Sequence, residues 1–326
     1  MIRLRYESRF GLARGAVFAG NLPVLFLEGL ERDPAMSVLG TRSVARVTGV
    51  GPVSFLALAD DAEAVLDAPQ AVSAKLTEGA MVEVTITAEA RSGKAAVARW
   101  ISAAEGEPRR LSPALTLKER LIERAQTLLG ATPVEDDDGD LDAAADEALS
   151  PSGPLPGGGH LWIEPTRGLI ACDVDTGAQG RDAAKRANEA AVTELGRRLK
   201  LSGLAGLIIT DLVGRKHDAE QLRALLTQAF SPEDIIIGPI GKFGTLEFVR
   251  PWGTCPAAHV PAALRTAARL LRDAVGANDG RPGRLLALRA PHDVLDIIRP
   301  RLKGSLDPLS PLIRLEPGPI PEIIAP

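Results

Sequence analysis

The sequence predicts a multi-domain α/β protein, with an α/β layer, an inserted β-barrel and a small C-terminal α/β domain. After residue 160, runs with strand patterning alternate with runs with helix patterning, which indicates an α/β layer. Residues 42–101 instead hold short β-patterned runs separated by Gly, Asp and Ser-Gly turn signals, which is typical of a small barrel or sandwich. The 326 residues, 45% of them apolar, suffice for two or three modest cores.

The first half of the chain divides into three predicted parts. Residues 1–40 contain two apolar runs, GAVFAG and PVLFLEGL, which we expect to pair as strands and to pack with the catalytic core. Residues 41–102 form the predicted barrel. Residues 103–159 begin with a helix at 115–130 that ends on a glycine, and they continue as an acidic and then Pro- and Gly-rich linker.

The net charge of −4 depends on the acidic tract at 135–147, which holds eight of the 42 acidic residues. Without this tract the balance is 38 basic against 34 acidic residues, which is compatible with a polyanionic partner but too weak to establish one. Two roles stay open for the tract. It either mimics a polyanionic partner in a basic cleft or only keeps a linker solvated, and we favour the second.

The sequence shows no signal peptide and no apolar run of membrane-spanning length, so we expect a protein without membrane contact. The two cysteines offer no disulfide framework, which fits a reducing compartment. A cytoplasmic location is therefore the expectation.

Residues 160–250 contain the most informative pattern, with the order strand, helix, strand, helix, strand. The expected strands are 161–173, 204–212 and 234–240, and the expected helices are 182–200 and 218–230. Asp173 and Asp211 close the first two strands. In open α/β sheets the carboxyl ends of the strands form the edge where ligands bind, so both side chains are expected to meet there.

Two carboxylates on adjacent strands suit a hard cation, Mg²⁺ or Mn²⁺, with open positions for water. Asp175 follows Asp173 on the same strand face and adds a third acid that needs a compensating charge. The alternative is that Asp173 and Asp211 only cap the following helices, and spacing alone does not decide between the two interpretations.

The segments GLIACDVDTG, RANEAA, RRLKLSGLAGLIITDLVG and KFGTLEFVR, in this order, resemble the catalytic segment of the ribonuclease E/G family. The resemblance implies a DNase I-like domain at 160–250 in which Asp173 and Asp211 hold Mg²⁺. It places Asp175 where the family usually has an assisting Asn, so all three residues are candidates for catalysis.

The same resemblance extends over most of the chain. It implies a reduced RNase H-like part at 1–40, an S1-like OB barrel at 41–102 and the family's small domain at 262–326. Between Trp100 and Gly157 the family carries a long region with a pocket for the RNA 5′-monophosphate. Here one helix and the acidic linker stand in that place, so we expect no 5′-end sensor.

Residues 251–261 correspond to the family's zinc-link, CPxCxG, in a degenerate form with one thiol, Cys255, and one imidazole, His259. Two chains together could offer Zn²⁺ two thiolates and two imidazoles, but we favour an ordinary turn without metal. The family's small domain supports a homodimer. Without paired thiols, a zinc-independent dimer and a monomer both stay open.

Single-stranded RNA is the expected partner. The resemblance places Phe55 of the barrel where the family stacks an aromatic ring on unpaired bases, and basic side chains near the metal are expected to bind phosphates. Phe243 is open between base stacking and core packing, and an aromatic content of 3% predicts weak or assisted RNA binding. The candidate RNA-binding residues are Phe55, Arg181, Lys185, Lys242, Phe243 and Arg250.

Three functions remain in view. We favour a magnesium-dependent endoribonuclease that cleaves single-stranded RNA independently of its 5′ end and leaves a 5′-phosphate and a 3′-hydroxyl. The second is a catalytically weak or inactive RNA-binding or assembly protein of the same fold, which mutation of Asp173 would distinguish. The third is a metal-dependent phosphoesterase acting on another phosphate ester, which substrate competition would reveal.

Overall fold

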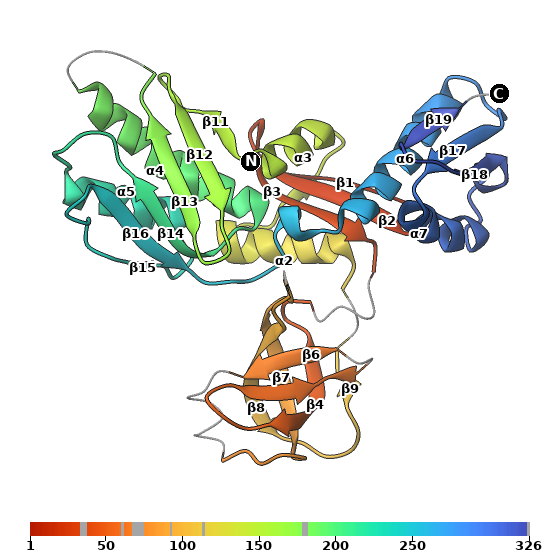
Figure 1. Cartoon of the computed structure of the whole chain (residues 1–326), viewed down its shortest axis with the longest axis horizontal. Helices are drawn as coiled ribbons and strands as arrows, with labels where there is room; N and C mark the ends of the chain where they lie inside the picture. Colours follow the sequence, from red (N-terminus) through yellow and green to blue (C-terminus); the bar gives the residue numbers. More distant parts are fainter. Residues whose placement is uncertain are drawn as a thin grey trace.

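The computed structural model describes residues 1–32, 38–59, 62–66, 75–91, 93–112, 115–177 and 182–324. Within these ranges the chain forms four β-sheets and six α-helices (Figure 1). The barrel hangs below the rest of the molecule, and an N-terminal sheet lies between the α/β layer and the C-terminal domain (Figure 1). None of the helices in the described ranges is both long and apolar enough to cross a membrane.

The N-terminal sheet is a three-stranded antiparallel meander with one short parallel strand added at its edge. The predicted pairing of the two apolar runs is confirmed. The strands are β1 (Ile2–Arg9), β2 (Leu12–Ala19), β3 (Leu22–Leu30) and β10 (Val134–Glu135).

Helix α2 (Leu117–Leu129) lies against this sheet and buries Leu121 and Ala125 in its core. A side-chain Cβ at Gly15 would lie 2.6 Å from the Leu121 Cδ1, so the close approach of helix and strand requires glycine there. The helix starts with a capping box between Thr116 and Glu119.

The barrel is closed because its first strand pairs with both the second and the fourth. Alternate residues of its strands fill the interior, as Val82, Val84 and Ile86 do. One strand, Glu63–Leu66, is too short to show a pattern in the sequence. The barrel strands are β4 (Arg42–Gly49), β5 (Ser54–Ala57), β6 (Glu63–Leu66), β7 (Met81–Ala88) and β8 (Ala96–Ala103), and β9 (Arg109–Arg110) pairs with β4 outside the closed ring.

The α/β layer is a six-stranded mixed sheet in the order β11-β12-β13-β14-β16-β15. One face is covered by helices α4 (Ala183–Ser202) and α5 (Ala219–Phe230), which share the largest apolar core with the sheet. The strands are β11 (Ser152–Pro154), β12 (His160–Pro165), β13 (Ile170–Asp175), β14 (Gly206–Asp211), β15 (Ile236–Ile237) and β16 (Thr245–Arg250).

The expected single strand at 161–173 is wrong. The segment is an antiparallel hairpin of β12 and β13, joined by a turn at 166–169. The Thr166 hydroxyl accepts hydrogen bonds from the backbone N–H groups of Gly168 and Leu169, at 3.3 and 3.1 Å, and so stabilises the turn. The sequence does mark this turn, because Pro165, Thr166 and Gly168 interrupt the apolar run, and the prediction of one strand overlooked that signal.

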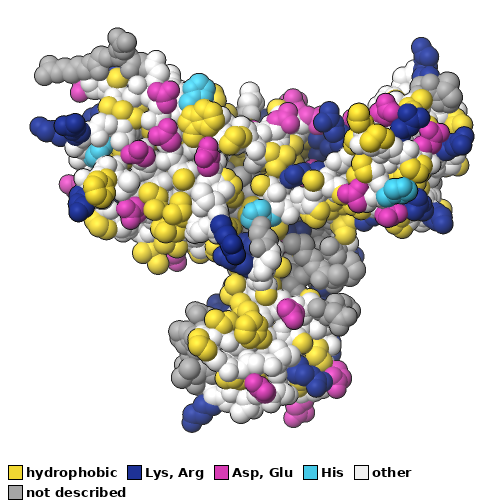
Figure 2. Space-filling model, in the orientation of Figure 1, with side chains coloured by type: hydrophobic (Ala, Val, Ile, Leu, Met, Phe, Trp, Pro, Cys, Tyr) yellow, Lys and Arg dark blue, Asp and Glu magenta, His cyan; other side chains and the backbone are white. Residues whose placement is uncertain are grey.

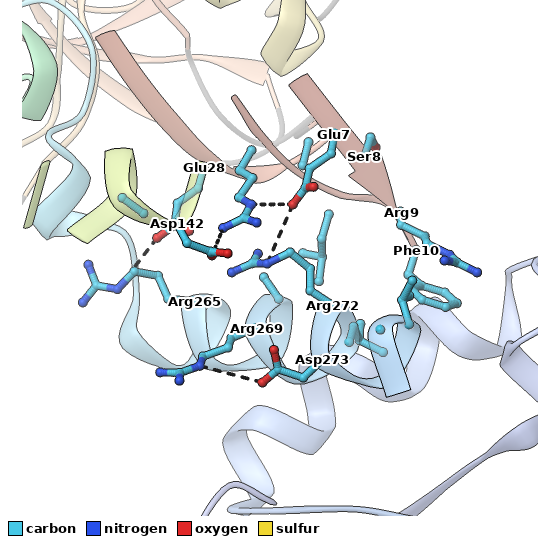
Figure 3. A pocket seen from close by; sticks show the side chains of 18 of the residues that line it. Glu7, Ser8, Arg9, Phe10, Glu28, Asp142, Arg265, Arg269, Arg272 and Asp273 are labelled. Atoms are coloured by element: carbon cyan, nitrogen blue, oxygen red, sulfur yellow. Dashed lines mark hydrogen bonds and ion pairs between the residues drawn. The ribbon is translucent and has the colours of Figure 1, made fainter. Parts of the chain in front are cut away.

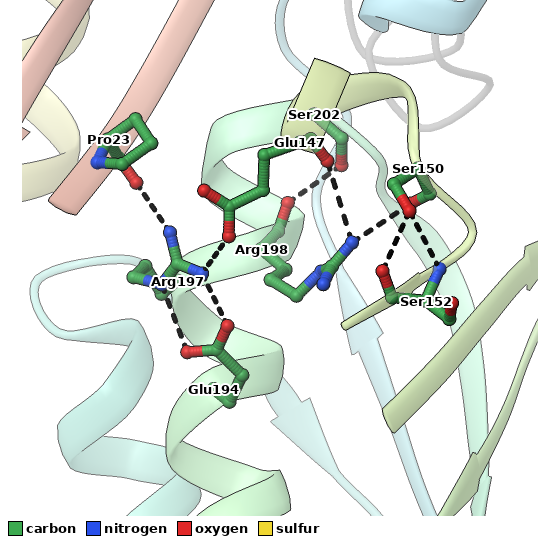
Figure 4. A network of polar contacts seen from close by, with 8 residues as sticks. All are labelled: Pro23, Glu147, Ser150, Ser152, Glu194, Arg197, Arg198 and Ser202. Carbon is green, nitrogen blue, oxygen red and sulfur yellow. Dashed lines mark hydrogen bonds and ion pairs between the residues drawn. The ribbon is translucent and has the colours of Figure 1, made fainter. Parts of the chain in front are cut away.

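The expected acidic linker is also wrong as a description of local structure. Residues 141–149 form helix α3 (Leu141–Leu149), which Asp140 caps by accepting from the Ala143 N–H at 2.9 Å. Its Ala144 lies in a core with Phe18 and Phe26 of the N-terminal sheet. Near its end, Glu147 pairs with Arg197 of α4 (Figure 4). The acids of this tract are therefore partners of structural arginines.

The C-terminal domain is a three-stranded sheet with two helices. It is anchored to the N-terminal sheet because Phe10 and Leu12 belong to its core and Arg9 pairs with Asp307. Its elements are α6 (Ala262–Asp279), β17 (Leu286–Ala290), α7 (His292–Lys303), β18 (Ile313–Pro317) and β19 (Glu322–Ile324).

Candidate metal and RNA site

Asp173 and Asp211 lie directly opposite each other on the adjacent parallel strands β13 and β14. Neighbouring strands are about 4.8 Å apart, so the two side chains leave the sheet side by side. Their neighbours in sequence, Cys172 and Thr210, point into the core, and both aspartates are exposed. The adjacency that the sequence predicts is present, and it places two carboxylates on one open face of the sheet.

The aspartates belong to a row that crosses the open face. Trp162 of β12 pairs with Asp173, and Thr245 of β16 pairs with Asp211. Figure 2 shows hydrophobic and acidic side chains on the surface of this lobe. Trp162 is 41% exposed. An aromatic ring thus borders the carboxylate pair on one side and a hydroxyl borders it on the other.

The loop after Asp211 is held by a residue that the sequence analysis did not single out. Asn188 of α4 is buried, and its amide exchanges two hydrogen bonds of 3.0 Å with the backbone of Val213. The Leu212 N–H donates to the Gly244 carbonyl at 3.2 Å, which ties the loop to the turn before β16. The sequence does contain a sign that Asn188 is important, because its amide interrupts the apolar face of a predicted helix.

His217 lies in the same loop, but it does not cap the helix that follows. Its ring is instead packed beside Gly244, because a Cβ there would lie 3.1 Å from the His217 Nε2. Both ring nitrogens are buried and have no hydrogen-bond partner among the described residues. Asp218 provides the helix cap by accepting from the Gln221 N–H.

The turn before β16 also carries two of the predicted RNA-binding residues. Phe243 is 82% exposed, so of its two predicted roles core packing is wrong. The Lys242 Nζ lies 5.1 Å from the centre of the Phe243 ring. Both residues are therefore presented to solvent within a few residues of Thr245, the partner of Asp211. Lys185, in the first turn of α4, is exposed as well and lies 3.9 Å from Glu189. Arg181 lies outside the described residues.

Arg250 does not join this group. It lies at the other end of β16 and is buried, with its Nε and Nη2 donating to the two carboxylate oxygens of Glu233 at 2.7 and 3.1 Å. Its Nη1 donates to the backbone carbonyls of Leu199 and Leu204. The guanidinium is thus a structural link between β16 and the end of α4, and it is not free to bind RNA phosphate.

Phe55 stands on barrel strand β5 with 54% of its surface exposed, opposite Val65 of β6. Its ring is available for stacking. Buried Glu89, which follows barrel strand β7, links the barrel to helix α2 and to the segment after β16, because it accepts hydrogen bonds from Arg120 and from the Cys255 N–H.

Cys255 and His259 flank a short 3₁₀ turn, Ala257–His259. Burial raises the pKa of the Cys255 thiol to about 11 and lowers the pKa of His259. Within one chain, the described residues contain no cluster of three or more His, Cys, Asp or Glu side chains that could hold a metal. An ordinary turn without metal therefore stays the prediction, and a zinc shared between two chains stays its alternative.

The segment that carries the two aspartates is also the part of the chain that matches known proteins. The model of the Ribonuclease E/G family matches residues 116–252, the stretch that contains both aspartates and the strands that carry them. Residues 116–252 of the chain are therefore similar to the ribonuclease E/G family. A Ribonuclease E of Nostoc sp. is 39% identical over 90 residues, which are 26% of this chain and 13% of that protein.

A second Ribonuclease E, of Synechocystis sp., is 38% identical over 122 residues, 34% of this chain and 18% of that protein. A third, of Buchnera aphidicola subsp. Schizaphis graminum, is 31% identical over 121 residues and matched over 12% of its length. The matched segments therefore span less than a fifth of the length of these curated relatives.

The donor set of the ribonuclease E/G segment fits a divalent hard cation. It consists of two exposed carboxylates side by side, with no basic side chain paired to either among the described residues. Mg²⁺ is commonly held by one or two carboxylates and fills its other positions with water and substrate phosphate. Asp175 lies one pleat further on the same face, and its Oδ1 accepts from the Gly177 N–H at 3.1 Å.

Proposed function

We propose that this chain is a magnesium-dependent endoribonuclease that cleaves single-stranded RNA without requiring a 5′-monophosphate. The observation that carries the proposal is the in-register pair Asp173 and Asp211 on an open sheet face, inside the segment matched by the ribonuclease E/G family. The two carboxylates lie side by side, and no basic side chain among the described residues pairs with either of them. Two carboxylates at this spacing repel each other, and a cation between them removes the repulsion.

In this proposal Asp173 and Asp211 hold the metal. A bound Mg²⁺ (or Mn²⁺) would supply Lewis-acid chemistry, which can polarise a phosphodiester oxygen and favour attack by a water. Asp175, on the same strand face, would orient the attacking water. Lys242 and Lys185 offset the negative charge of the phosphates on either side of the scissile bond. Hydrolysis in this direction leaves a 5′-phosphate and a 3′-hydroxyl.

RNA binding is proposed to use aromatic surfaces at two places. Phe243 beside the metal site and Phe55 on the barrel are both exposed and can stack on unpaired bases. Stacking of this kind selects single strands over duplexes, since paired bases hide their faces. The S1-like identity of the barrel, the RNase H-like part and a homodimer belong to the same proposal.

The test is cleavage of a labelled unpaired RNA that bears either a 5′-hydroxyl or a 5′-monophosphate, with Mg²⁺ or with EDTA. Wild type is compared with Asp173→Asn and Asp211→Asn. Glu164→Gln is the matched control, since Glu164 is an exposed acid on the same sheet face, one pairing row away from Asp173. We expect cutting that requires Mg²⁺, is lost in both Asp variants, persists in the control and ignores the 5′ end.

Other outcomes identify the alternatives. RNA binding without cutting under any condition would make the chain a catalytically inactive RNA-binding protein. Faster turnover of a nucleotide or sugar phosphate than of RNA would make it a phosphoesterase of another class.

A further inference from the structure

A cavity lies at the opposite end of the α/β sheet from the aspartate pair. It encloses about 620 Å³ between barrel strand β7, helix α2 and the segment 250–254. Arg250 pairs with Gly206 at this end of the sheet, whereas Thr245 pairs with Asp211 at the other. Five residues of strand separate the two ends, which is about 17 Å. The cavity is therefore distinct from the proposed metal site.

The wall of this cavity contains polar groups that lack partners. Arg124 of α2 is only 5% exposed, and its Nη2 makes one long hydrogen bond of 3.4 Å to the Lys200 carbonyl. Its Nε has no partner among the described residues, and the same holds for the Arg120 Nε and for the buried Thr254 Oγ1. Buried polar groups are nearly always hydrogen-bonded, so three unpaired groups in one cavity require an explanation.

The carboxylates deep in this cavity are already occupied. Glu89 is completely buried, holds Arg120 through both oxygens at 2.9 Å and also accepts two backbone N–H groups. Glu233 is held by Arg250 through both oxygens. Arg124 has no carboxylate partner of its own among the described residues. Burial, reinforced by repulsion from Arg250, lowers its pKa to about 10.

Other buried arginines among the described residues have ion-pair or hydrogen-bond partners. In the larger cavity between the N-terminal sheet and α6, Arg14 pairs with Glu7 and Asp142, and Arg272 lies 3.8 Å from Glu7 (Figure 3). Arg198 of α4 donates to the backbone carbonyls of Ser150 and Glu147 (Figure 4). An unpaired buried guanidinium costs several kcal/mol. Arg198 also has no carboxylate partner among the described residues, but it donates to two carbonyls, whereas Arg124 has one long hydrogen bond and an unpaired Nε.

We propose that this cavity binds a small organic anion whose single negative charge is shared by two oxygens, as in a carboxylate or a phosphodiester. The Arg124 guanidinium supplies the charge, and the Arg124 Nε and Thr254 Oγ1 donate hydrogen bonds to the two oxygens. Glu123 and Asp234, both exposed, also line the cavity and repel a dianion more strongly than a monoanion. The assignment stands independently of the proposed RNA cleavage.

The test measures the thermal unfolding midpoint of the full chain in acetate, dimethyl phosphate or inorganic phosphate at pH 8, against chloride of equal ionic strength. We expect acetate or dimethyl phosphate to raise the midpoint by about 2–4 °C at ten times its dissociation constant. The anion with the larger effect identifies whether the natural ligand is a carboxylate or a phosphodiester. A larger effect of the phosphate dianion would overturn the single-charge assignment.

Two variants and one control locate the effect. Arg124→Met keeps the length of the side chain and removes its charge, and we expect it to abolish the shift without lowering the midpoint in chloride. Thr254→Val should reduce the shift while keeping the side-chain volume. Arg198→Met removes a buried arginine outside the cavity and should keep the shift. A shift that survives in both Arg124→Met and Thr254→Val, or no shift with any anion in wild type, would refute the proposal.

Discussion

Replacing Asp211 by Asn should have opposite effects on stability with and without metal. Asp173 and Asp211 stand in register on neighbouring strands, so their carboxylates are about 5 Å apart. Two unit charges at that distance in water repel by about 0.8 kcal/mol, and physiological salt reduces this to about 0.5 kcal/mol. In EDTA, Asp211→Asn should therefore raise the free energy of unfolding by about 0.5 kcal/mol.

With Mg²⁺ at ten times its dissociation constant, the wild type should gain about 1.4 kcal/mol, and the variant should gain much less because one ligand has lost its charge. The wild type then becomes the more stable protein. Urea unfolding is the suitable assay, since urea adds no ionic strength, and Trp162 beside Asp173 offers a fluorescence signal from this sheet. Glu164→Gln should show no such reversal. The same ranking of wild type and Asp211→Asn in EDTA and in Mg²⁺ would refute the metal site.

Four further predictions follow from the structure. Arg250→Met should lower the free energy of unfolding by about 3–5 kcal/mol in urea titrations, because Glu233 is left as an unpaired buried charge, and RNA affinity measured on folded protein should not change. His217→Phe should keep cleavage and raise stability, since it removes two unpaired buried nitrogens, and lost cleavage would instead show that a ring nitrogen takes part in the reaction. Asp175→Asn should cleave RNA at least as fast as the wild type in the same assay, because an amide oxygen preserves the contact with the Gly177 N–H while one repulsive charge disappears. Burial raises the pKa of Glu28, so the folded state holds its proton more tightly than the unfolded state, and stability should fall as pH rises from the ordinary carboxyl pKa through the raised one. Glu28→Gln should flatten that part of the curve of stability against pH.

The sequence predicted those parts of the fold that depend on neighbouring residues. The helices expected at 182–200 and 218–230 are found at Ala183–Ser202 and Ala219–Phe230, because their apolar periodicity and end signals are local. The meeting of Asp173 and Asp211 followed from a general rule for parallel strands, and it needed no knowledge of distant contacts.

The features that the sequence did not reveal depend on partners far along the chain. A guanidinium such as that of Arg250 can bind RNA phosphate, but here it is buried against Glu233 and two carbonyls near residue 200. The acidic tract resembles a solvated linker until Arg197, 50 residues from Glu147, is placed beside it. Arg124 belongs to an ordinary amphipathic helix in the sequence, and only the fold shows that its charge is unmatched.

The position of β13 between β12 and β14 limits how this part of the gene can change. An insertion or deletion of one residue within the strand would move Asp173 to the helix-covered face and bring Cys172 or Val174 out to solvent. Such a change would also break the hydrogen-bonded register of β13 with both β12 and β14. Variation in length among descendants of this protein should therefore collect in the turn at 166–169 and in the segments that follow the aspartates, while the strand keeps its residue count.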